Sequence, residues 1–488
     1  MPTKRTKQPT NCLHCQQQGM SRRALLQQSA LGFGNLALAS LVADQSLAAK
    51  KTINRRLNPL APLQPHFTPR AKRVIFLFMK GGPSHVDTFE YKPKLQRDDG
   101  KELPFKKPRV TFADTGKLLG SPWKFKPAGE MGIPVSELFP NVAQCVDDIC
   151  FLHSVHGTNS AHGGALLKLH TGSDNFVRPS MGSWVTYGLG TENQNLPGFV
   201  TICPTLAHGG VKNWGSAFLP AHYQGTPLGV ASQPSTNAKV KYAKNRWTST
   251  NVQRRQLDML NEINREHLAQ AGPELDLEAR ISSFELAFRM QMEMPQIEDL
   301  SSETKETFSL YGIDQKITED FGRQCLLARR FAEKGVRFIQ VTHSDSMVQW
   351  DQHSNLQEGH TKNALEVDRP IAGLLKDLKA RGLLQDTLVM WGGEFGRTPT
   401  AQGTNGRDHN PEGFTMWFAG GGVKPGFRYG ATDEYGYYAE ENKMHVHDLH
   451  ATLLHLLGLD HEQLTYQYAG RDFRLTDVSG DVATEILA

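Results

Sequence analysis

Continuous apolar runs along the chain predict the strands of a buried sheet. Five such runs occupy residues 74–79, 149–152, 336–342, 387–391 and 414–419. Short runs without polar alternation are typical of central strands that are covered on both faces. Polar or glycine-rich loops follow the runs, so we expect ligand-binding side chains at the carboxyl ends of these strands.

Apolar positions at helical spacing predict helices between these strands. Ile371, Leu374 and Leu378 share one face of a segment that ends before Gly382, and a second pattern covers residues 449–457. The alternation of strands and helices predicts a mostly parallel sheet. Residues 251–310 are polar and helix-forming, which favours a helical insertion that packs on the sheet domain.

The first fifty residues predict an export signal. Arg22 and Arg23 precede a weakly hydrophobic run at residues 30–43, and Ala48 or Ala49 suits cleavage. The segment resembles a twin-arginine signal, although an amphipathic N-terminal helix is the alternative. We therefore expect a signal peptide at residues 1–49, a linker at 50–70 and one α/β domain at 71–480. The predicted location is the periplasm or the cell exterior, with the twin-arginine translocation machinery as a partner.

Composition narrows the class of protein. The chain has 488 residues, of which 21% are charged and 39% hydrophobic, as in ordinary globular proteins. A formal net charge of +4 is too small to suggest nucleic acid as a partner. The body contains no stretch of about 20 apolar residues, so we expect no stable membrane span.

The cysteines leave their role open. Cys12 and Cys15 look like half of a zinc clip, but no second pair follows at matching spacing. The remaining four are compatible with disulfides in an oxidising compartment or with simple burial. They are Cys145, Cys150, Cys203 and Cys325.

A hydroxyl-rich loop follows the second predicted strand and opens a predicted helix. Thr158 and Ser160 lie in it, between His156 and His162. Hydroxyls at a helix N-terminus are commonly caps. The same position suits a nucleophile, because the helix dipole stabilises an alkoxide and binds an anionic ester. Capping explains one hydroxyl at most, so Thr158, Ser160 and His162 are candidate catalytic residues.

Histidines and aspartates gather after three other strands. Asp87 follows the first run, in a glycine-rich segment that is also an ordinary turn. Carboxylates mixed with imidazoles suit Zn²⁺, Mn²⁺ or Fe, whereas Mg²⁺ and Ca²⁺ favour oxygen alone. The candidates after the third run are His343, Asp345, Asp351, His353 and His360, and those nearer the C-terminus are Asp408, His409 and His447.

Two arginines accompany these candidates. Arg397 and Arg407 could hold an ester oxygen of a phosphate or sulfate group. The alternative for each is a structural salt bridge to Glu394 or Asp408. If it holds an ester oxygen, Arg397 is a candidate catalytic residue.

The order of these clusters along the chain resembles that of an exported bacterial family called domain of unknown function 1501 (DUF1501), often labelled sulfatase-related. The resemblance covers nearly everything from about residue 70 to the C-terminus. The segments that carry it are residues 81–89, 178–184, 350–353, 393–399, 406–411 and 447–454. The family is placed in the alkaline-phosphatase-like superfamily. The resemblance therefore implies a three-layer α/β fold, with a mostly parallel central sheet, helices on both faces and a helical insertion.

The superfamily implies a chemistry as well. Its members use an Asp after the first strand, a Ser, Thr or modified Cys nucleophile at a helix start, and later Asp/His pairs that bind two divalent metals. By order and context, the nucleophile role falls to Thr158 or Ser160. The metal ligands would come from Asp87, Asp351, His353, Asp408 and His409, with His447 as a further candidate.

This sequence departs from the superfamily pattern at three points. His162 stands where small residues are usual, and Asp351 and His353 are closer together than the usual pair. The motif of Cys or Ser followed by x-Pro-x-Arg, which sulfatases need to make formylglycine, is absent from the sequence. We therefore expect an exported hydrolase of phosphate or sulfate esters that does not use formylglycine. Its substrate would be a small-molecule or polysaccharide ester.

Two other functions stay open on the sequence alone. The first is a non-catalytic secreted protein that binds metal or glycan on a retained hydrolase fold. The second is an oxidoreductase that uses the export route for its cofactor, although no dinucleotide fingerprint supports it.

Overall fold

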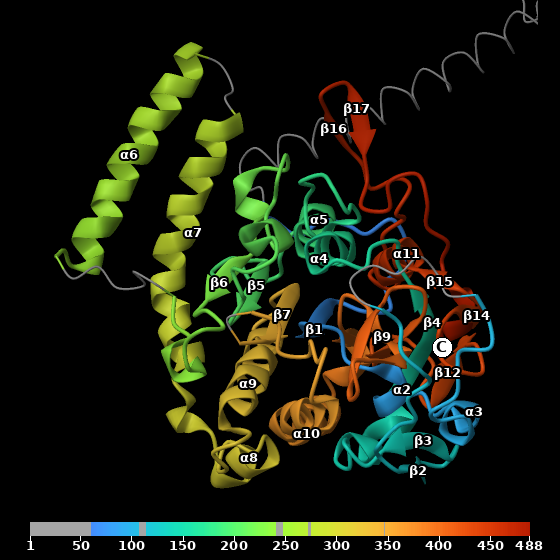
Figure 1. Ribbon diagram of the computed structural model, residues 1–488. Helices are drawn as coiled ribbons and strands as arrows, with labels where there is room; N and C mark the ends of the chain where they lie inside the picture. The colour runs from blue at the N-terminus through green and yellow to red at the C-terminus, as the bar shows by residue number, and fades with distance from the viewer. Residues whose placement is uncertain (1–59, 107–113, 241–246, 272–274, 346) are drawn as a thin grey trace, which may run out of the picture. The chain divides into compact units, whose positions relative to one another are not determined.

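The computed structural model describes residues 60–106, 114–240, 247–271, 275–345 and 347–488 (Figure 1). The predicted signal peptide, residues 50–59 of the predicted linker, Cys12 and Cys15 lie outside these residues. None of the described helices is both long enough and apolar enough to cross a membrane.

The described chain builds a mixed α/β fold around one large sheet (Figure 1). Within the described residues this sheet has nine strands, and their buried apolar side chains form the core. Eight strands follow one another in space, and the short β15 (Met444–His445) pairs with β4. The spatial order is β12 (Phe427–Tyr429), β4 (Ile149–His156), β11 (Phe414–Ala419), β8 (Thr387–Gly392), β1 (Arg73–Met79), β7 (Phe338–His343), β5 (Phe199–Ile202) and β6 (Thr226–Leu228).

The sheet is mostly parallel, as predicted. The five strands from β8 through β1, β7 and β5 to β6 run parallel. The five apolar runs correspond to β1, β4, β7, β8 and β11, so those predictions are confirmed. One strand reverses direction, because β11 is antiparallel to both β8 and β4.

Parallel pairing brings three loops to one edge of the sheet. Met79 of β1 pairs with His343 of β7, and Phe78 pairs with Gly392 of β8. The segments that follow β1, β7 and β8 therefore leave the sheet together. These segments carry many of the polar residues that the sequence identifies as candidates.

Helices cover both faces of this sheet, which confirms the predicted layering (Figure 1). On one side lie α4 (His162–Thr171), α5 (Met181–Leu189) and α11 (Val446–Leu456), and on the other α9 (Glu319–Glu333) and α10 (Leu356–Ala380). Leu374, Leu375 and Leu378 of α10 are buried, as their spacing predicts. Shorter helices are α2 (His85–Thr88), α3 (Pro93–Arg97) and α8 (Lys305–Leu310).

Short elements complete the described chain. Two-stranded sheets pair β9 (Gly396–Gln402) with β10 (Gly406–Asn410), β2 (Phe125–Ala128) with β3 (Ile133–Ser136), β13 (Ala431–Thr432) with β14 (Ala439–Glu441), and β16 (Tyr466–Tyr468) with β17 (Arg471–Phe473). Turns of 3₁₀ helix occupy Val142–Asp148, Gly210–Asn213, Ala221–Tyr223, Ser235–Asn237, Leu300–Ser302, Leu384–Asp386 and Thr484–Ile486.

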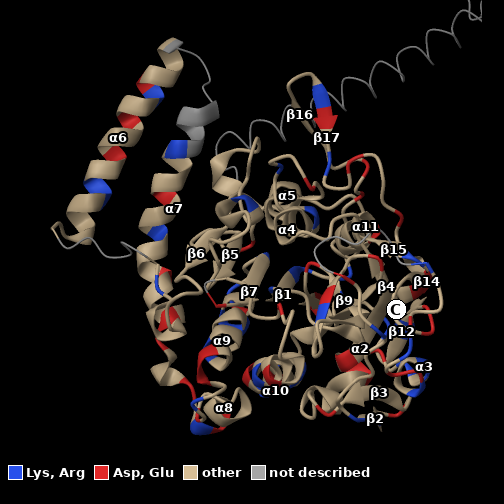
Figure 2. Ribbon diagram, in the orientation of Figure 1, with Lys and Arg blue, Asp and Glu red and all other residues tan. Residues whose placement is uncertain are grey.

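Two long helices occupy the polar segment between β6 and α8. They are α6 (Thr250–Ala271) and α7 (Leu275–Glu298). Arg254 of α6 donates to both carboxylate oxygens of Glu285 on α7, at 2.9 and 2.7 Å. On α7, Met290, Met294 and Ile297 are buried in the core, whereas Phe284 is 58% exposed. Basic and acidic residues alternate along both helices (Figure 2), which is the charge pattern of a solvated helix.

The four described cysteines are free thiols in the interior. They are Cys145, Cys150, Cys203 and Cys325. Of the two alternatives for these four cysteines, the structure therefore shows simple burial and no disulfides. Burial raises the pKa of the Cys145 thiol to about 11, which keeps it protonated and unreactive.

Buried neutral histidines make the fold sensitive to acid, and His170 provides a test. His170 is packed beside Phe76 and Phe78, and burial lowers its pKa from 6.5 to about 4. Between these two values the unfolded chain binds more protons than the folded one, so stability falls as the pH drops below about 6.5. The expected loss from this one residue is about 2 kcal/mol between pH 7 and pH 5.

The measurement is urea unfolding of the wild type and of His170→Leu at pH 7 and pH 5. The wild type should lose about 2 kcal/mol more than the variant over this interval. Equal losses would mean that folding leaves the pKa of His170 unchanged.

Candidate metal centre

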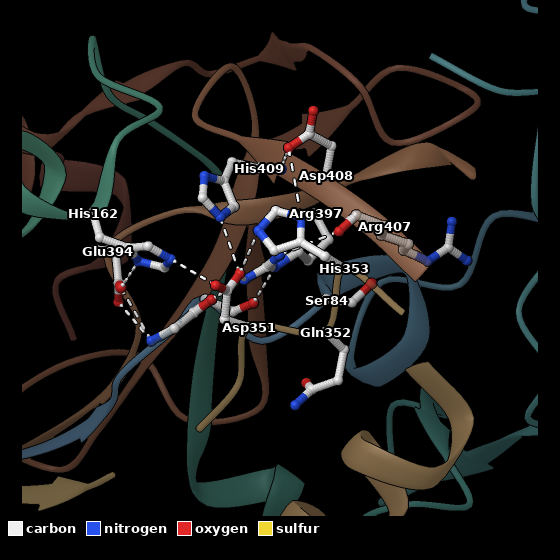
Figure 3. A network of polar contacts seen from close by, with 12 residues as sticks. Ser84, His162, Asp351, Gln352, His353, Glu394, Arg397, Arg407, Asp408 and His409 are labelled. Atoms are coloured by element: carbon white, nitrogen blue, oxygen red, sulfur yellow. Dashed lines mark hydrogen bonds and ion pairs between the residues drawn. The ribbon is translucent and has the colours of Figure 1, made fainter. Parts of the chain in front are cut away.

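Asp351 lies at the centre of a cluster of nitrogen donors (Figure 3). Its Oδ1 atom is 2.9 Å from Nε2 of His353, 3.0 Å from Nε2 of His409 and 2.6 Å from a guanidinium nitrogen of Arg397. Its Oδ2 atom is 3.1 Å from Nε2 of His162. These five residues come from four separate segments, which the sheet edge and the β9–β10 hairpin bring together.

Close backbone packing positions Asp351. The amide of the fully buried Trp350 donates to the carbonyl of Lys80 at 3.0 Å. A Cβ at Gly81 would lie 2.7 Å from the Trp350 nitrogen, and Gly81 has a φ of +113°. Only glycine fits this position, because the loop after β1 must pass directly against the loop that carries Asp351.

Two groups of three side chains can each hold a divalent cation. One consists of His162, Asp351 and His409, and the other of His353, Asp408 and His409. Within each group the ligand atoms lie within 4.8 Å of one another. Mixed imidazole and carboxylate donors suit Zn²⁺, Mn²⁺ or Fe. Because the groups share His409, two bound cations would be neighbours.

The protons of two histidines point away from this centre. Nδ1 of His409 donates to the carbonyl of Ser160 at 2.6 Å, and Nδ1 of His162 lies 2.7 Å from a carboxylate oxygen of Glu394. In the neutral ring the other nitrogen, Nε2, then carries a lone pair. Both Nε2 atoms face the carboxylate of Asp351, so lone pairs meet a negative charge. A cation between them would relieve this repulsion, and the donor set therefore fits a divalent metal.

The electrostatics distinguish two histidines of the cluster. Burial lowers the pKa of His162, but the carboxylates of Asp351 and Glu394 outweigh it and raise that pKa, so a cation at Nε2 would replace a proton there. Burial lowers the pKa of His409 to about 4, so the ring is neutral at pH 7. Burial raises the pKa of Asp351, but its close contacts with His162, His353 and His409 and the charge of Arg397 outweigh it and hold that pKa well below its usual range. Nε2 of His162 is buried and makes no hydrogen bond, despite its 3.1 Å approach to Asp351. Such a nitrogen is free for a cation.

Arg397 is buried within the protein. Its donors go to the carbonyls of Gly81, Gly82 and Arg407 and to the carboxylate of Asp351. The sequence predicted that Arg397 could hold an ester oxygen. Its fully buried guanidinium instead orients Asp351, so the salt-bridge alternative applies, with Asp351 as the partner in place of Glu394 or Asp408.

Asp87 lies outside both ligand groups. Its two oxygens accept from Arg407 at 2.7 and 3.1 Å, and Ser84 donates to it at 2.5 Å. The side chains of Asp87 and Arg407 are both fully buried. Arg407 and Ser84 thus bond both oxygens of this predicted metal ligand.

The remaining histidine candidates also have other partners. Nε2 of His447 donates to the carbonyl of Gly172 at 2.8 Å, outside both ligand groups. His343 bonds Glu366 and accepts from Trp350. His360 accepts from the amide of Ser84 at 3.0 Å. Within the predicted cluster after β7, only Asp351 and His353 reach the centre.

A cavity of about 220 Å³ opens beside the centre, and Thr158 and Ser160 line it together with Asp408 and His409. Neither hydroxyl caps α4, since the residue at the cap position is Ala161, whose amide donates to the side chain of Asn159 at 2.8 Å. Thr158 donates instead to Asp174 at 2.8 Å. Both predicted nucleophiles therefore border the same cavity as two of the predicted metal ligands.

Two buried ionisable residues of the site were not identified as ligands from the sequence. Glu394 had been considered only as a salt-bridge partner, and it reaches His162 across 232 positions of chain. Lys80 is fully buried and donates to Thr205 and to the carbonyl of Ala207. Burial lowers the pKa of Lys80 to about 8. Their positions were the signal in the sequence that could have identified them, since Lys80 is the first residue after β1 and Glu394 the second after β8.

Comparison with known proteins identifies the family. The model described as "Protein of unknown function (DUF1501)" matches residues 71–487. A search of curated proteins finds no match.

Several solved structures are similar to this chain. The sulfatase PsFucS1 from Pseudoalteromonas sp. is 13% identical, with a TM-score of 0.35 over 80% of this chain and 69% of that one. The lipoteichoic acid synthase LtaP from Listeria monocytogenes is 10% identical, with a TM-score of 0.33 over 87% and 80%. The TAB5 alkaline phosphatase, in a mutant with Mg bound, is 11% identical, with a TM-score of 0.30 over 81% and 99%. All three similarities are remote, so the site itself has to carry the functional argument.

Proposed function

The chain belongs to the DUF1501 family, and from this premise and the geometry of its site we propose that it is a metal-dependent hydrolase of phosphate or sulfate esters. One observation carries the proposal. Nε2 atoms of His162 and His409 converge on the carboxylate of Asp351, beside a cavity whose lining includes both candidate nucleophiles, Thr158 and Ser160. Cation ligands and a nucleophile in one cavity are the parts that ester hydrolysis needs.

We assign the cation ligands to the two groups that share His409. The first cation would be held by His162, Asp351 and His409, and the second by His353 and Asp408 beside it. Bound divalent cations would lower the pKa of a nearby hydroxyl and offset the negative charge of the ester. Arg397 contributes by orienting Asp351, since its own donors are occupied inside the protein.

Ser160 or Thr158 serves as the nucleophile. The hydroxyl oxygen attacks phosphorus or sulfur, its proton leaves, and the bond to the leaving oxygen breaks as that oxygen gains a proton. Water then hydrolyses the ester formed on the enzyme. Ser160 is held at the centre because its carbonyl accepts from His409. Thr158 has a carboxylate at 2.8 Å, Asp174, that could take its proton.

The substrate class and location follow the sequence-based expectation. We propose a small-molecule or polysaccharide ester as the substrate, and export by the twin-arginine route. The signal residues lie outside the described part of the chain. An exported protein whose N-terminus begins at residue 49 or 50 would agree with this route.

The test of the nucleophile is turnover of aryl phosphate and aryl sulfate by the wild type, Ser160→Ala and Thr158→Ala. Removing the nucleophile should lower kcat by about 10³-fold or more with little change in metal content. The other alanine variant should keep most of its activity and serves as the matched control.

Two results would contradict this assignment. If both variants keep full activity, neither hydroxyl is the nucleophile. If the metal-loaded wild type turns over neither ester, the protein is better explained as a non-catalytic metal-binding protein.

A further inference from the structure

Glu394 is a buried carboxylate whose partners all belong to the site. It lies directly after β8, and its side chain is fully buried. Its Oε1 atom lies 2.7 Å from Nδ1 of His162. Both of its oxygens accept from the amide of Gly81, at 3.0 and 3.1 Å (Figure 3). Glu394 thus connects the loop after β1 to the start of α4.

These contacts restrict where the proton of His162 can lie. A carboxylate only accepts hydrogen bonds, so Nδ1 of His162 must carry a hydrogen. In the neutral imidazole the lone pair then belongs to Nε2, the atom that faces Asp351 at 3.1 Å. A buried carboxylate behind a ligating histidine fixes both the tautomer and the orientation of the ring.

We propose that Glu394 is a positioning residue, which holds the proton of His162 on Nδ1 and directs the Nε2 lone pair at the cation beside Asp351. The cation part of this inference rests on the function proposed for the site, whereas the tautomer part does not. Glu394 touches neither the cavity lining nor the two hydroxyls, so its effect passes through His162.

The hydrogen bonds around Glu394 explain why this position needs a carboxylate. With Gly81 donating to both oxygens and His162 to one, every hydrogen bond at this side chain is accepted. A glutamine of the same shape has one oxygen and one amino group. Its amino group would face either the Gly81 amide or Nδ1 of His162, and donor would meet donor. The burial of Glu394 leaves no water to relieve this conflict.

The test compares Co²⁺ binding and the visible Co²⁺ spectrum in the full-length wild type and Glu394→Gln. We expect Co²⁺ affinity to fall about 10- to 100-fold in the variant, with a changed spectrum. Glu394→Asp keeps the charge but withdraws it from His162, and should lie between the two. It also replaces Glu394→Gln if that variant does not fold.

Glu90→Gln is the matched control. Glu90 is an equally buried glutamate, but it accepts from Thr432 and pairs with Lys92. This control should bind Co²⁺ with the affinity and spectrum of the wild type. A loss in Glu90→Gln equal to that in Glu394→Gln would overturn the proposal, because a general effect of buried carboxylates would then explain both.

A second measurement separates this inference from the proposed function. In ¹⁵N-histidine-labelled protein, the Nδ1–H proton of His162 should resonate far downfield because it bonds a carboxylate, and it should move upfield in Glu394→Gln. His162→Ala assigns the signal. Unchanged Co²⁺ binding and an unchanged proton in Glu394→Gln would overturn the inference while the proposed function stands. If the wild type binds no Co²⁺ but the proton still moves, the proposed function fails and the tautomer assignment holds.

Discussion

Replacing Asp351 with asparagine is expected to lower divalent-cation affinity by at least about 100-fold, or about 2.7 kcal/mol. Three imidazoles and one guanidinium surround the two carboxylate oxygens, and the contact of Arg397 with this carboxylate is a strong, charge-assisted one. An asparagine would supply one neutral oxygen as a ligand and would remove the negative charge that attracts the cation. The measurement is elemental analysis after dialysis, together with Zn²⁺ titration of the metal-free protein.

Asp345→Asn provides the matched control for this variant. Asp345 lies in the same segment after β7, but it is exposed and accepts from the amide of Met347 at 2.7 Å. The same chemical change should leave metal content unaltered there. If Asp351→Asn also kept its metal, the converging nitrogens would need another explanation, such as a structural histidine cluster.

The strands that support the site were predictable for a simple physical reason. β1, β7 and β8 are buried on both faces, so their sequences are apolar throughout and contrast with the loops that follow. The sheet edge also followed, because parallel strands end together. The short strands β5 and β6 at one end of the sheet were not predicted, since four and three residues give little pattern to detect.

The site was harder to predict than the sheet. The segment at residues 343–360 holds three histidines and two aspartates, and metal binding was the favoured explanation for the group. In the structure His343 and His360 bond protein groups, while Asp351 and His353 reach the centre. Sequence spacing gives the types of donor present. Which way each side chain points depends on packing between segments hundreds of residues apart.

The partners of Glu394 and Arg397 could not be predicted from the sequence either. Both are charged residues in one short loop, and a salt bridge between them was one of the alternatives that the sequence left open. The structure separates them, because Glu394 turns to His162 and Arg397 to Asp351. Each charge found a partner from a distant segment, which one sequence does not reveal.

Replacing Arg407 with leucine is expected to cost about 3–5 kcal/mol of folding free energy, because it leaves the buried charge of Asp87 without its partner. The pair is fully buried and bidentate, at 2.7 and 3.1 Å. Urea unfolding at pH 7 measures the change as a shift in midpoint at constant slope. Arg254→Leu is the control, since the Arg254–Glu285 pair is partly exposed and should cost about 1 kcal/mol or less.

Asp87→Asn then distinguishes a structural role of Asp87 from a role in metal binding, since this predicted ligand lies apart from the centre. If Asp87 serves only to hold Arg407, this variant should lose stability yet keep the metal content of the wild type. A ligand role would produce the opposite pattern, with metal lost in step with Asp351→Asn. The structure favours the first result, because both Asp87 oxygens already accept hydrogen bonds from Arg407 and Ser84, and because Asp87 belongs to neither ligand group.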